Sequence, residues 1–375
     1  MPAASAPAVI SLASGYGSFA PPLVATAAAT RVLQAAGPLP VAAVAGLPEL
    51  RAALAESYQQ AGASGVQPEH VVVTGGTKAA LFALLQAVLR PGDEVLLPTP
   101  NWFGFWELVV RAGGTVRALP LSAADNYALA PETLRAALTP HTRVVLFSNP
   151  NNPTGRVYSR AEIAGWLSVT QDFPDLFVLS DEIYNGITFS PEPVPTLLSF
   201  PDPRQRHMVV NGYSKSLALI GWGIGYLVAP LPIAQICAAG LHATGSAVPV
   251  LQQHAAVAAT RHASAIARSL IESLQPTRHR MQTELALLPQ VPAPQAAATY
   301  YFFPDLRAYL RPELEPVAAS AELVARLHAT GVAVVDGATC GAPGFVRLSY
   351  AVPMAQLEPA LERLRAGLST PFSAA

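Results

Sequence analysis

The sequence predicts an α/β protein, with a large domain built on a doubly wound, mostly parallel sheet and a smaller α+β domain at the C-terminus. Two observations carry this prediction. Between residues 71 and 229, short apolar strand candidates alternate with helices, which is the pattern of a doubly wound sheet. Beyond Pro292 the pattern becomes mixed, and a chain of 375 residues is long enough for two domains.

The elements are expected in the following order. A helix covers residues 46–60, because apolar side chains recur there at near-helical spacing. The strands of the large sheet are expected at residues 71–74, 94–97, 144–147, 177–179, 208–210 and 224–228. A helical region rich in Ala, Leu and Arg follows at residues 251–288. The C-terminal part is expected to contain strands at 299–303, 332–335 and 346–350 and helices at 319–330 and 354–368.

These elements divide the chain into four parts. An N-terminal segment (1–40) is expected to pack with the small domain, and the large domain covers residues 41–250. A connecting helical region (251–290) then leads to the small C-terminal domain (291–375). The active site is expected in the cleft between the two domains.

Composition excludes several classes of protein. The net charge is −1 and no basic stripe is present, so we expect no nucleic-acid partner. Charged residues make up only 13% and mean hydropathy is +0.34, but prolines and polar residues interrupt the uncharged stretch 216–260, so we expect no membrane span. Residues 1–11 lack the positive region of a secretory signal. Cys237 and Cys340 have no metal spacing, which predicts reduced thiols, a cytoplasmic location and no metal site.

Lys215 is the most informative residue of the chain. It lies in the run Asn-Gly-Tyr-Ser-Lys-Ser, and no Asp, Glu, Lys or Arg follows it until Arg261. An ammonium in such uncharged surroundings is partly desolvated, which lowers its pKa. A neutral amine is a nucleophile that forms Schiff bases with carbonyl compounds. A surface lysine in a Gly-rich loop remains the alternative when this segment is taken alone.

In three further segments, a predicted strand is followed by residues of types that bind ligands. The turn 148–155 (Ser-Asn-Pro-Asn-Asn-Pro-Thr-Gly) follows one apolar strand, and Asp181 and Tyr184 follow another. In parallel α/β sheets, ligands bind outside the carboxyl ends of the strands. The third segment, 71–82, reads as a strand, a Gly-Gly turn and an Ala/Leu helix, and a helix start of this kind suits a phosphate. Each segment alone also fits an ordinary turn or a helix cap.

Taken together, the order and spacing of these four segments resemble the class I/II aminotransferases, the aspartate-aminotransferase-like enzymes of fold-type I that use pyridoxal 5'-phosphate. The resemblance covers nearly the whole chain, from Ser14-Gly15 to the run 345–351. It implies an aminotransferase that moves an amino group from an L-amino acid to a 2-oxo acid through a Schiff base on Lys215. It also implies a large domain that binds the cofactor and a homodimer that completes the site.

The resemblance assigns the residues around the cofactor ring. Lys215 matches the Schiff-base lysine, and Asp181 matches the carboxylate that pairs with the protonated pyridine nitrogen. Tyr184 and Asn152 match the groups that hydrogen-bond the phenolic oxygen, and Trp102 matches the aromatic residue that stacks on the ring. Lys215, Asp181 and Tyr184 are therefore the expected catalytic residues.

The resemblance also assigns the phosphate and substrate contacts. Gly76, Thr77 and Lys78 fall on the phosphate-binding turn. Arg347 matches the arginine that binds the substrate α-carboxylate, a task suited to a planar guanidinium that donates two parallel hydrogen bonds. Gly15 lies where a backbone group contacts the substrate, and Asn152 is expected to contact it as well.

Two departures from the family pattern concern the cofactor phosphate. Family members usually carry Arg at the position of Gly223 and a Tyr, which reaches the neighbouring subunit's phosphate, near the position of Val41. A hydrogen bond to a charged group contributes about 1.5–3 kcal/mol, so losing the Arg should weaken cofactor binding by about one to two orders of magnitude. We expect Lys78 to replace it, because Lys78 begins the helix on the phosphate side.

Several alternatives remain open from sequence. A β- or γ-eliminating lyase would use the same Lys215 and Asp181, and a homologue with weakened phosphate binding would be specialised or non-catalytic. A nicotinamide dehydrogenase has a similar sheet, but residues 75–80 do not fit its G-x-G-x-x-G fingerprint. The amino donor is not determined. Tyr16, Phe19 and Phe103 hint at an apolar or aromatic substrate side chain, although they fit plain cleft walls at least as well.

Overall fold

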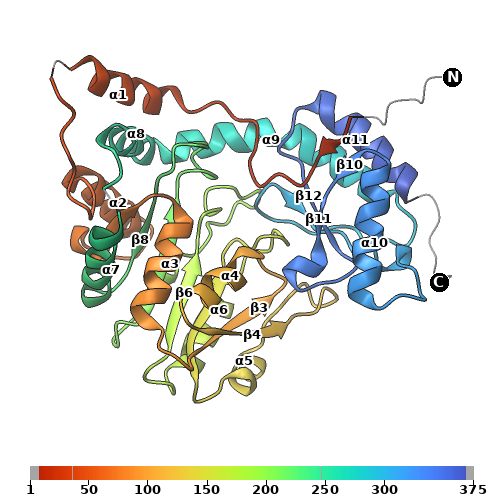
Figure 1. The fold of residues 1–375 in the computed structure, drawn as a ribbon, viewed down its shortest axis with the longest axis horizontal. Coiled ribbons are helices and arrows are strands. Elements are labelled where there is room, and N and C mark those ends of the chain that lie inside the picture. The colour runs from red at the N-terminus through yellow and green to blue at the C-terminus, as the bar shows by residue number, and fades with distance from the viewer. Residues whose placement is uncertain (1–7, 36, 246, 369–375) are drawn as a thin grey trace.

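The computed structural model describes residues 8–35, 37–245 and 247–368. A seven-stranded sheet with the order β2-β8-β7-β6-β5-β3-β4 forms the centre of its larger part (Figure 1). The strands are β2 (Val71–Thr74), β3 (Glu94–Thr99), β4 (Thr115–Pro120), β5 (Thr142–Ser148), β6 (Phe177–Asp181), β7 (His207–Gly212) and β8 (Gly225–Val228). Strand β8 is antiparallel to both of its neighbours, whereas the pairs β3–β4, β3–β5, β5–β6 and β6–β7 are parallel. This arrangement confirms the predicted fold class.

Helices cover both faces of the sheet. Along β5, Val145 and Phe147 belong to an apolar cluster with one set of helices, and Val144 and Leu146 belong to a cluster with the other set. The first set is α2 (Pro48–Gln60), α5 (Pro131–Ala137), α6 (Arg160–Thr170) and α8 (Val250–Arg261). The second set is α3 (Thr77–Val88), α4 (Gly104–Arg111) and α7 (Leu231–Thr244). Burial on both faces explains why the strands read as continuous apolar runs in the sequence.

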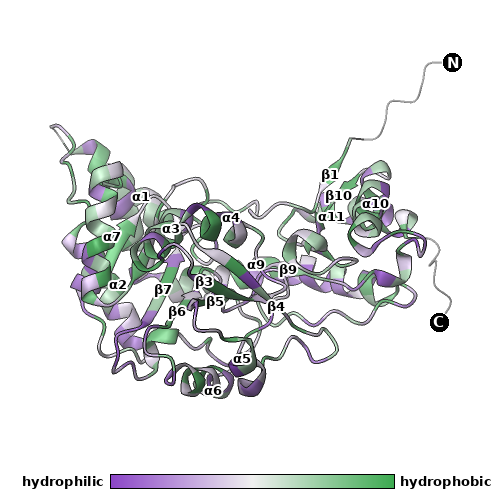
Figure 2. Cartoon of the chain, turned by 60° about the horizontal axis from the view of Figure 1, so that its bottom comes forward, coloured by the Kyte–Doolittle hydropathy of each residue, from purple (hydrophilic) through white to green (hydrophobic). Residues whose placement is uncertain are grey.

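The C-terminal part has its own sheet and core. Strands β11 (Val335–Asp336), β12 (Val346–Ser349) and β9 (Tyr301–Phe302) form an antiparallel sheet in that order. Helices α10 (Pro316–Ala329) and α11 (Met354–Gly367) contribute to the core of this part. In both Figure 1 and Figure 2 they lie at the opposite end of the molecule from α2 and α7. The long helix α9 (Ala263–Ala286) runs between the two ends.

The N-terminal segment touches both parts of the molecule. Strand β1 (Ile10–Ser11) pairs in parallel with β10 (Val332–Ala333) of the C-terminal part. Helix α1 (Leu23–Gln34) instead packs against α8 of the larger part. Residues 12–22 therefore pass from one part to the other, and Gly15 lies on this crossing. The predicted domain boundaries at residues 40, 250 and 290 stay predictions.

Some elements differ from those expected. The helical region predicted at 251–288 is two helices, α8 and α9, which meet at His262. Helices α1 and α7 and strand β4 were not anticipated. Helix α7 contains no Asp, Glu, Lys or Arg, so its sequence offers little contrast between a polar and an apolar face. Strand β4 lies at the sheet edge and is partly exposed, so it lacks the apolar run of the central strands.

Candidate active site

The loop after β7 places Lys215 at the carboxyl end of the central sheet. Its Nζ donates a hydrogen bond of 2.5 Å to the carbonyl oxygen of Gly15 and lies 3.8 Å from the centre of the Tyr16 ring. Burial lowers the pKa of the Lys215 ammonium to about 7, and the positive charges of Arg347 and Lys78 lower it further, against the opposing effect of Asp181. The amine is therefore largely neutral at slightly alkaline pH, as its sequence context predicts.

Asp181 ends strand β6 beside the lysine loop. Its Oδ1 accepts a hydrogen bond of 3.2 Å from the Ile183 backbone N–H, and its side chain is buried. Burial raises the pKa of the Asp181 carboxyl to about 7, while the Ile183 hydrogen bond and the Lys215 charge act in the opposite direction. A carboxyl with this environment gains from a cationic partner, because an opposite charge lowers the cost of ionising it.

The hydroxyl of Ser216 joins the segments that carry these two groups. Ser216 Oγ donates to the Ile183 carbonyl (2.9 Å) and accepts from the Gly186 N–H (3.1 Å). The two segments approach so closely that a Cβ on Gly186 would lie 3.0 Å from the Ser216 Cβ. Ser216 thus holds the loop after β7 against the loop after β6. Sequence reasoning did not single it out.

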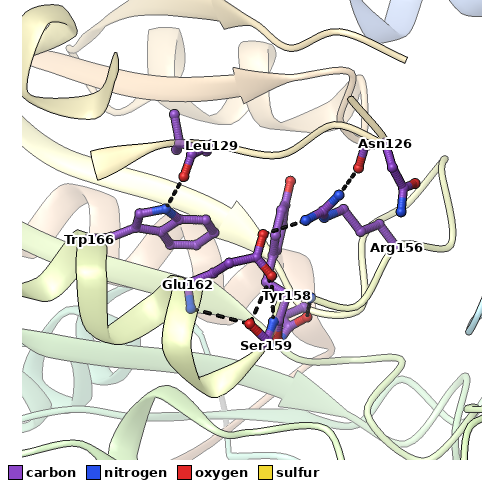
Figure 3. Close-up of polar contacts among 8 residues, drawn as sticks. Asn126, Leu129, Arg156, Tyr158, Ser159, Glu162 and Trp166 are labelled. Carbon is purple, nitrogen blue, oxygen red and sulfur yellow. Dashed lines mark hydrogen bonds and ion pairs between the residues drawn. The ribbon is translucent and has the colours of Figure 1, made fainter. Parts of the chain in front are cut away.

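Arg156, which follows the turn 148–155, contacts Glu162 of helix α6 (Figure 3). Arg156 forms an ion pair with Glu162 and donates to the Asn126 carbonyl. Glu162 also accepts hydrogen bonds of 2.9 Å from both the backbone N–H and the hydroxyl of Ser159, which completes a capping box at the start of α6. Farther along α6, Trp166 Nε1 donates to the Leu129 carbonyl at 2.7 Å. These contacts fix the chain immediately after the turn 148–155.

Arg347 on β12 reaches across to this turn. Its Nη1 donates to Asn152 Oδ1 at 3.1 Å, its Nη2 donates to the Ala13 carbonyl at 3.0 Å, and its guanidinium lies 4.3 Å from the centre of the Tyr301 ring. Among the described residues its buried Nε has no hydrogen-bond acceptor. A buried guanidinium with an unused donor is suited to a carboxylate, which accepts two parallel hydrogen bonds.

The carbonyl oxygen of Gly15 is a meeting point of the site. It accepts from Lys215 Nζ, from the Tyr300 hydroxyl at 2.7 Å and from the Tyr301 hydroxyl at 3.2 Å. The Tyr301 hydroxyl also lies 2.8 Å from the Tyr184 hydroxyl. The structure therefore brings Gly15, Tyr184, Lys215 and Arg347 into one constellation. Tyr301 was missed, because nothing in a strand with two adjacent tyrosines shows which of them faces the site.

The start of helix α3 forms the other side of the site. Gly76 is its N-cap residue, with φ of 100°, and a Cβ on Gly75 or Gly76 would meet nothing within 4 Å. In contrast, a Cβ on Gly225 would lie 2.6 Å from the Thr77 nitrogen, so glycine there lets the helix start approach β8. Thr77 Oγ1 donates to the Asn211 carbonyl at 3.3 Å. Open space beside the N–H groups of a helix start fits a phosphate.

Lys78 and Trp102 lie together on this side. Lys78 Nζ is 5.4 Å from the centre of the Trp102 ring, and its charge is close enough to Lys215 to lower the pKa of that amine. Trp102 packs edge-on against Phe105 at 5.3 Å. Lys78 and Lys215 are the only two lysines in the sequence. Every residue predicted for the site thus lies at the carboxyl end of the sheet or on the segments that face it.

The two departures from the family pattern have a structural setting. Gly223 has φ of 59°, a left-handed conformation that glycine adopts without strain, and a Cβ there would meet nothing within 4 Å. Val41 follows α1 and is 92% exposed. Neither position therefore supplies a polar group to the phosphate side from within this chain.

Comparison with known proteins places the chain in a family. The model of aminotransferase class I and II matches residues 7–364. An aspartate/prephenate aminotransferase of Thermus thermophilus is 35% identical over 358 residues, covering 95% of this chain and 90% of the relative, and one of Cereibacter sphaeroides is 32% identical over 366 residues, covering 96% and 90%. The crystal structure of an aspartate aminotransferase from Rhizobium meliloti has a TM-score of 0.89 at 30% identity, covering 96% of this chain and 92% of that one.

These matches decide between the alternatives left open by the sequence. The relatives are named as transaminases, so neither an eliminating lyase nor a dehydrogenase is favoured. No helix of the described residues is long and apolar enough to cross a membrane. The chain belongs to the class I and II aminotransferases, and it is a transferase that moves amino groups between amino acids and 2-oxo acids.

Proposed function

We propose that the chain binds pyridoxal 5'-phosphate at the constellation around Lys215 and uses it to transfer the amino group of an L-amino acid to a 2-oxo acid. The observation that carries the proposal is the joint placement of a lysine with lowered pKa, a buried acid and a buried arginine. When bound, the cofactor supplies an electron sink for the charge released at the substrate Cα. The protein supplies binding, orientation and proton transfer.

The chain's own groups divide this work. Lys215 would hold the cofactor aldehyde covalently and, once released, would carry the proton taken from the substrate Cα. Asp181 would keep the pyridine nitrogen protonated, and Tyr184 and Asn152 would donate to the phenolic oxygen. Trp102 would pack on the ring. The helix start at Gly76, Thr77 and Lys78 receives the phosphate, where the open space beside Gly75 and Gly76 accommodates it.

Arg347 binds the substrate α-carboxylate beside Gly15 and Asn152. In the structure its two Nη groups are engaged with the Ala13 carbonyl and Asn152 Oδ1, and its Nε has no acceptor within the described part of the chain. A carboxylate therefore replaces weaker neutral acceptors with a charge-assisted, bidentate contact. This contact would fix the orientation of the substrate Cα in the site.

The proposal is tested by incubating the purified chain and pyridoxal 5'-phosphate with a panel of amino donors and 2-oxoglutarate. Aspartate is the first donor to test, because the relatives are named for aspartate and prephenate, and aromatic donors follow because Tyr16 lies over Lys215. The expected product is glutamate. Formation of pyruvate and ammonia without glutamate would instead establish elimination, and the absence of any reaction would refute the proposal.

We further propose a homodimer in the cytoplasm. Leu23, Leu33 and Val41 lie on α1 and the segment after it, and their exposures of 85%, 61% and 92% are those of an apolar surface that a second copy covers. The two cysteines, Cys237 and Cys340, are buried and free, which suits a reducing compartment. Size-exclusion chromatography with light scattering tests the dimer, and a monomer at micromolar concentration would contradict it.

Phosphate binding gives a sharper prediction. Replacing Lys78 with Ala should weaken the affinity for pyridoxal 5'-phosphate by about 10–100-fold, because Lys78 places a positive charge in the first turn of α3. Gly223→Arg is the matched gain-of-contact variant and should tighten binding, although the left-handed backbone there costs roughly 1–2 kcal/mol. Absorbance titration at fixed ionic strength measures both affinities. Unchanged affinity in Lys78→Ala would remove this role.

A further inference from the structure

Tyr301 contacts three groups of the proposed site at once. Its hydroxyl lies 2.8 Å from the Tyr184 hydroxyl and 3.2 Å from the Gly15 carbonyl oxygen, and its ring lies under the Arg347 guanidinium at 4.3 Å. The side chain is fully buried on β9, which pairs with β12, the strand of Arg347. Its neighbour Phe302 instead packs against Tyr350 and lies 5.9 Å from the Arg278 guanidinium.

The hydrogen atoms at this junction can be counted. The Tyr301 hydroxyl has one hydrogen, which it gives either to Gly15 or to Tyr184. If it is given to Tyr184, the Gly15 carbonyl still accepts from Tyr300 at 2.7 Å and from Lys215 at 2.5 Å. Tyr184 is then free to direct its own hydrogen toward another acceptor in the site. The two phenols thus form a chain in which Tyr301 supports donation by Tyr184.

Arg347 acts on the hydrogen-bonded pair Tyr301–Tyr184 through the Tyr301 ring. A guanidinium over an aromatic face is attracted by the ring and holds it in place. The same positive charge favours release of the phenolic hydrogen toward an acceptor, because it stabilises negative charge on the oxygen. Tyr301 therefore connects the group proposed to bind the substrate carboxylate with the group proposed to face the cofactor oxygen. The phenol of Tyr16 also acts on Tyr301, and the Tyr300 hydroxyl shares the Gly15 carbonyl with it.

We infer that Tyr301 is a positioning residue that orients Tyr184 as a hydrogen-bond donor to the phenolic oxygen of the cofactor and links it to Arg347. This inference rests on the proposed function. Tyr301 itself does not need to touch cofactor or substrate, since it acts through the hydroxyl of Tyr184. A purely structural tyrosine in the same core would stabilise the fold without affecting that oxygen.

The chain offers a matched control for this distinction. Tyr350 is also fully buried, belongs to the same apolar cluster and donates its hydroxyl to a backbone carbonyl, that of Thr299, at 2.8 Å. Tyr301→Phe and Tyr350→Phe each remove one buried phenolic hydroxyl and keep the ring. Only the first removes a partner of Tyr184. Because neither change leaves a large cavity, both variants should fold, and thermal unfolding verifies this.

The experiment is a pH titration of the visible absorption of the bound cofactor in wild type, Tyr301→Phe and Tyr350→Phe. A hydrogen-bond donor at the phenolic oxygen stabilises the negative charge of that oxygen. It therefore lowers the pKa of the nearby proton, which lies on the nitrogen that links the cofactor to Lys215. Weaker donation in Tyr301→Phe should therefore raise the midpoint of the titration by about half a pH unit, the size of one modest hydrogen bond. Tyr350→Phe should leave the midpoint at the wild-type value.

A double-mutant cycle makes the test specific for Tyr184. In a Tyr184→Phe background, Tyr301→Phe should shift the midpoint no further, because its effect passes through the missing hydroxyl. Equal shifts in both backgrounds, or a Tyr301→Phe midpoint equal to that of Tyr350→Phe, would overturn the inference while leaving the proposed function intact. If wild type shows no cofactor absorption, the proposed function fails and the inference fails with it.

Discussion

Replacement of Lys215 with Ala is expected to abolish covalent attachment of pyridoxal 5'-phosphate and to reduce amino-group transfer by roughly 10²–10⁴-fold or more. The structure gives the reason, since the amine of Lys215 lies among Gly15, Tyr16, Asp181 and Arg347. Borohydride reduction followed by mass spectrometry of the peptides measures attachment. Lys78 is the only other lysine in the sequence, so Lys78→Ala is the control variant. In that variant the cofactor adduct on the peptide that contains Lys215 should persist.

The same amine sets a pH dependence. Burial holds the pKa of Lys215 at about 7, whereas an ordinary lysine titrates near 10.5. Since only the neutral amine attacks the cofactor aldehyde, the rate of attachment to cofactor-free protein should rise with pH and level off above about pH 7–8. Stopped-flow absorbance at a series of pH values gives this profile. A rate that keeps rising to pH 10 would show that the amine is not desolvated.

Asp181→Asn is expected to retain covalent attachment but to lower kcat by roughly 10²–10⁴-fold. Asparagine keeps the size of the side chain, and its Oδ1 can still accept from the Ile183 N–H, so the change removes the charge and little else. The carboxylate would keep the pyridine nitrogen of a bound cofactor protonated, and asparagine would not. Single-turnover kinetics of the loaded variant measures the step directly.

The neighbouring acid is the matched control for this variant. Glu182 is also buried, but its Oε1 accepts hydrogen bonds from the Thr196 hydroxyl (3.1 Å) and the Leu197 N–H (2.9 Å). Glu182→Gln should therefore keep wild-type turnover. If Asp181→Asn and Glu182→Gln lose activity equally, the effect belongs to burial of an acid at the end of β6 and not to contact with the cofactor.

Much of the fold was readable from the sequence because burial on both faces of the sheet leaves continuous apolar runs. Strands β3, β5, β6 and β7 fall where such runs occur. Strand β4 was not predicted because it is a partly exposed edge strand. Helix α7 was not predicted because it has no charged residues to mark a polar face with helical spacing. The hydrophobic pattern of a segment reflects the burial of its side chains. Elements with unusual burial are therefore the ones that the pattern does not predict.

Candidate site residues stand out in the sequence where they lie at the end of a strand. Asp181 ends β6, Lys215 and Asn152 follow β7 and β5, and their roles stay predictions drawn from the resemblance to a known family. Contacts between distant segments were not predictable. Arg347 meets Asn152 across 195 positions, and Tyr301 meets Tyr184 across 117. Only the folded chain shows which of two adjacent tyrosines, 300 or 301, pairs with the phenol of Tyr184.

The sequence has only two lysines, Lys78 at the start of α3 and Lys215 in the loop after β7, and this has a practical consequence. Acylating reagents such as succinimidyl esters modify primary amines, which in most proteins are spread over the whole surface. Here the α-amino group and these two ammonium groups are the chain's entire complement of primary amines. Labelling of the two lysines therefore reports on occupancy of the candidate site, and immobilisation through amines would block groups that an assay requires.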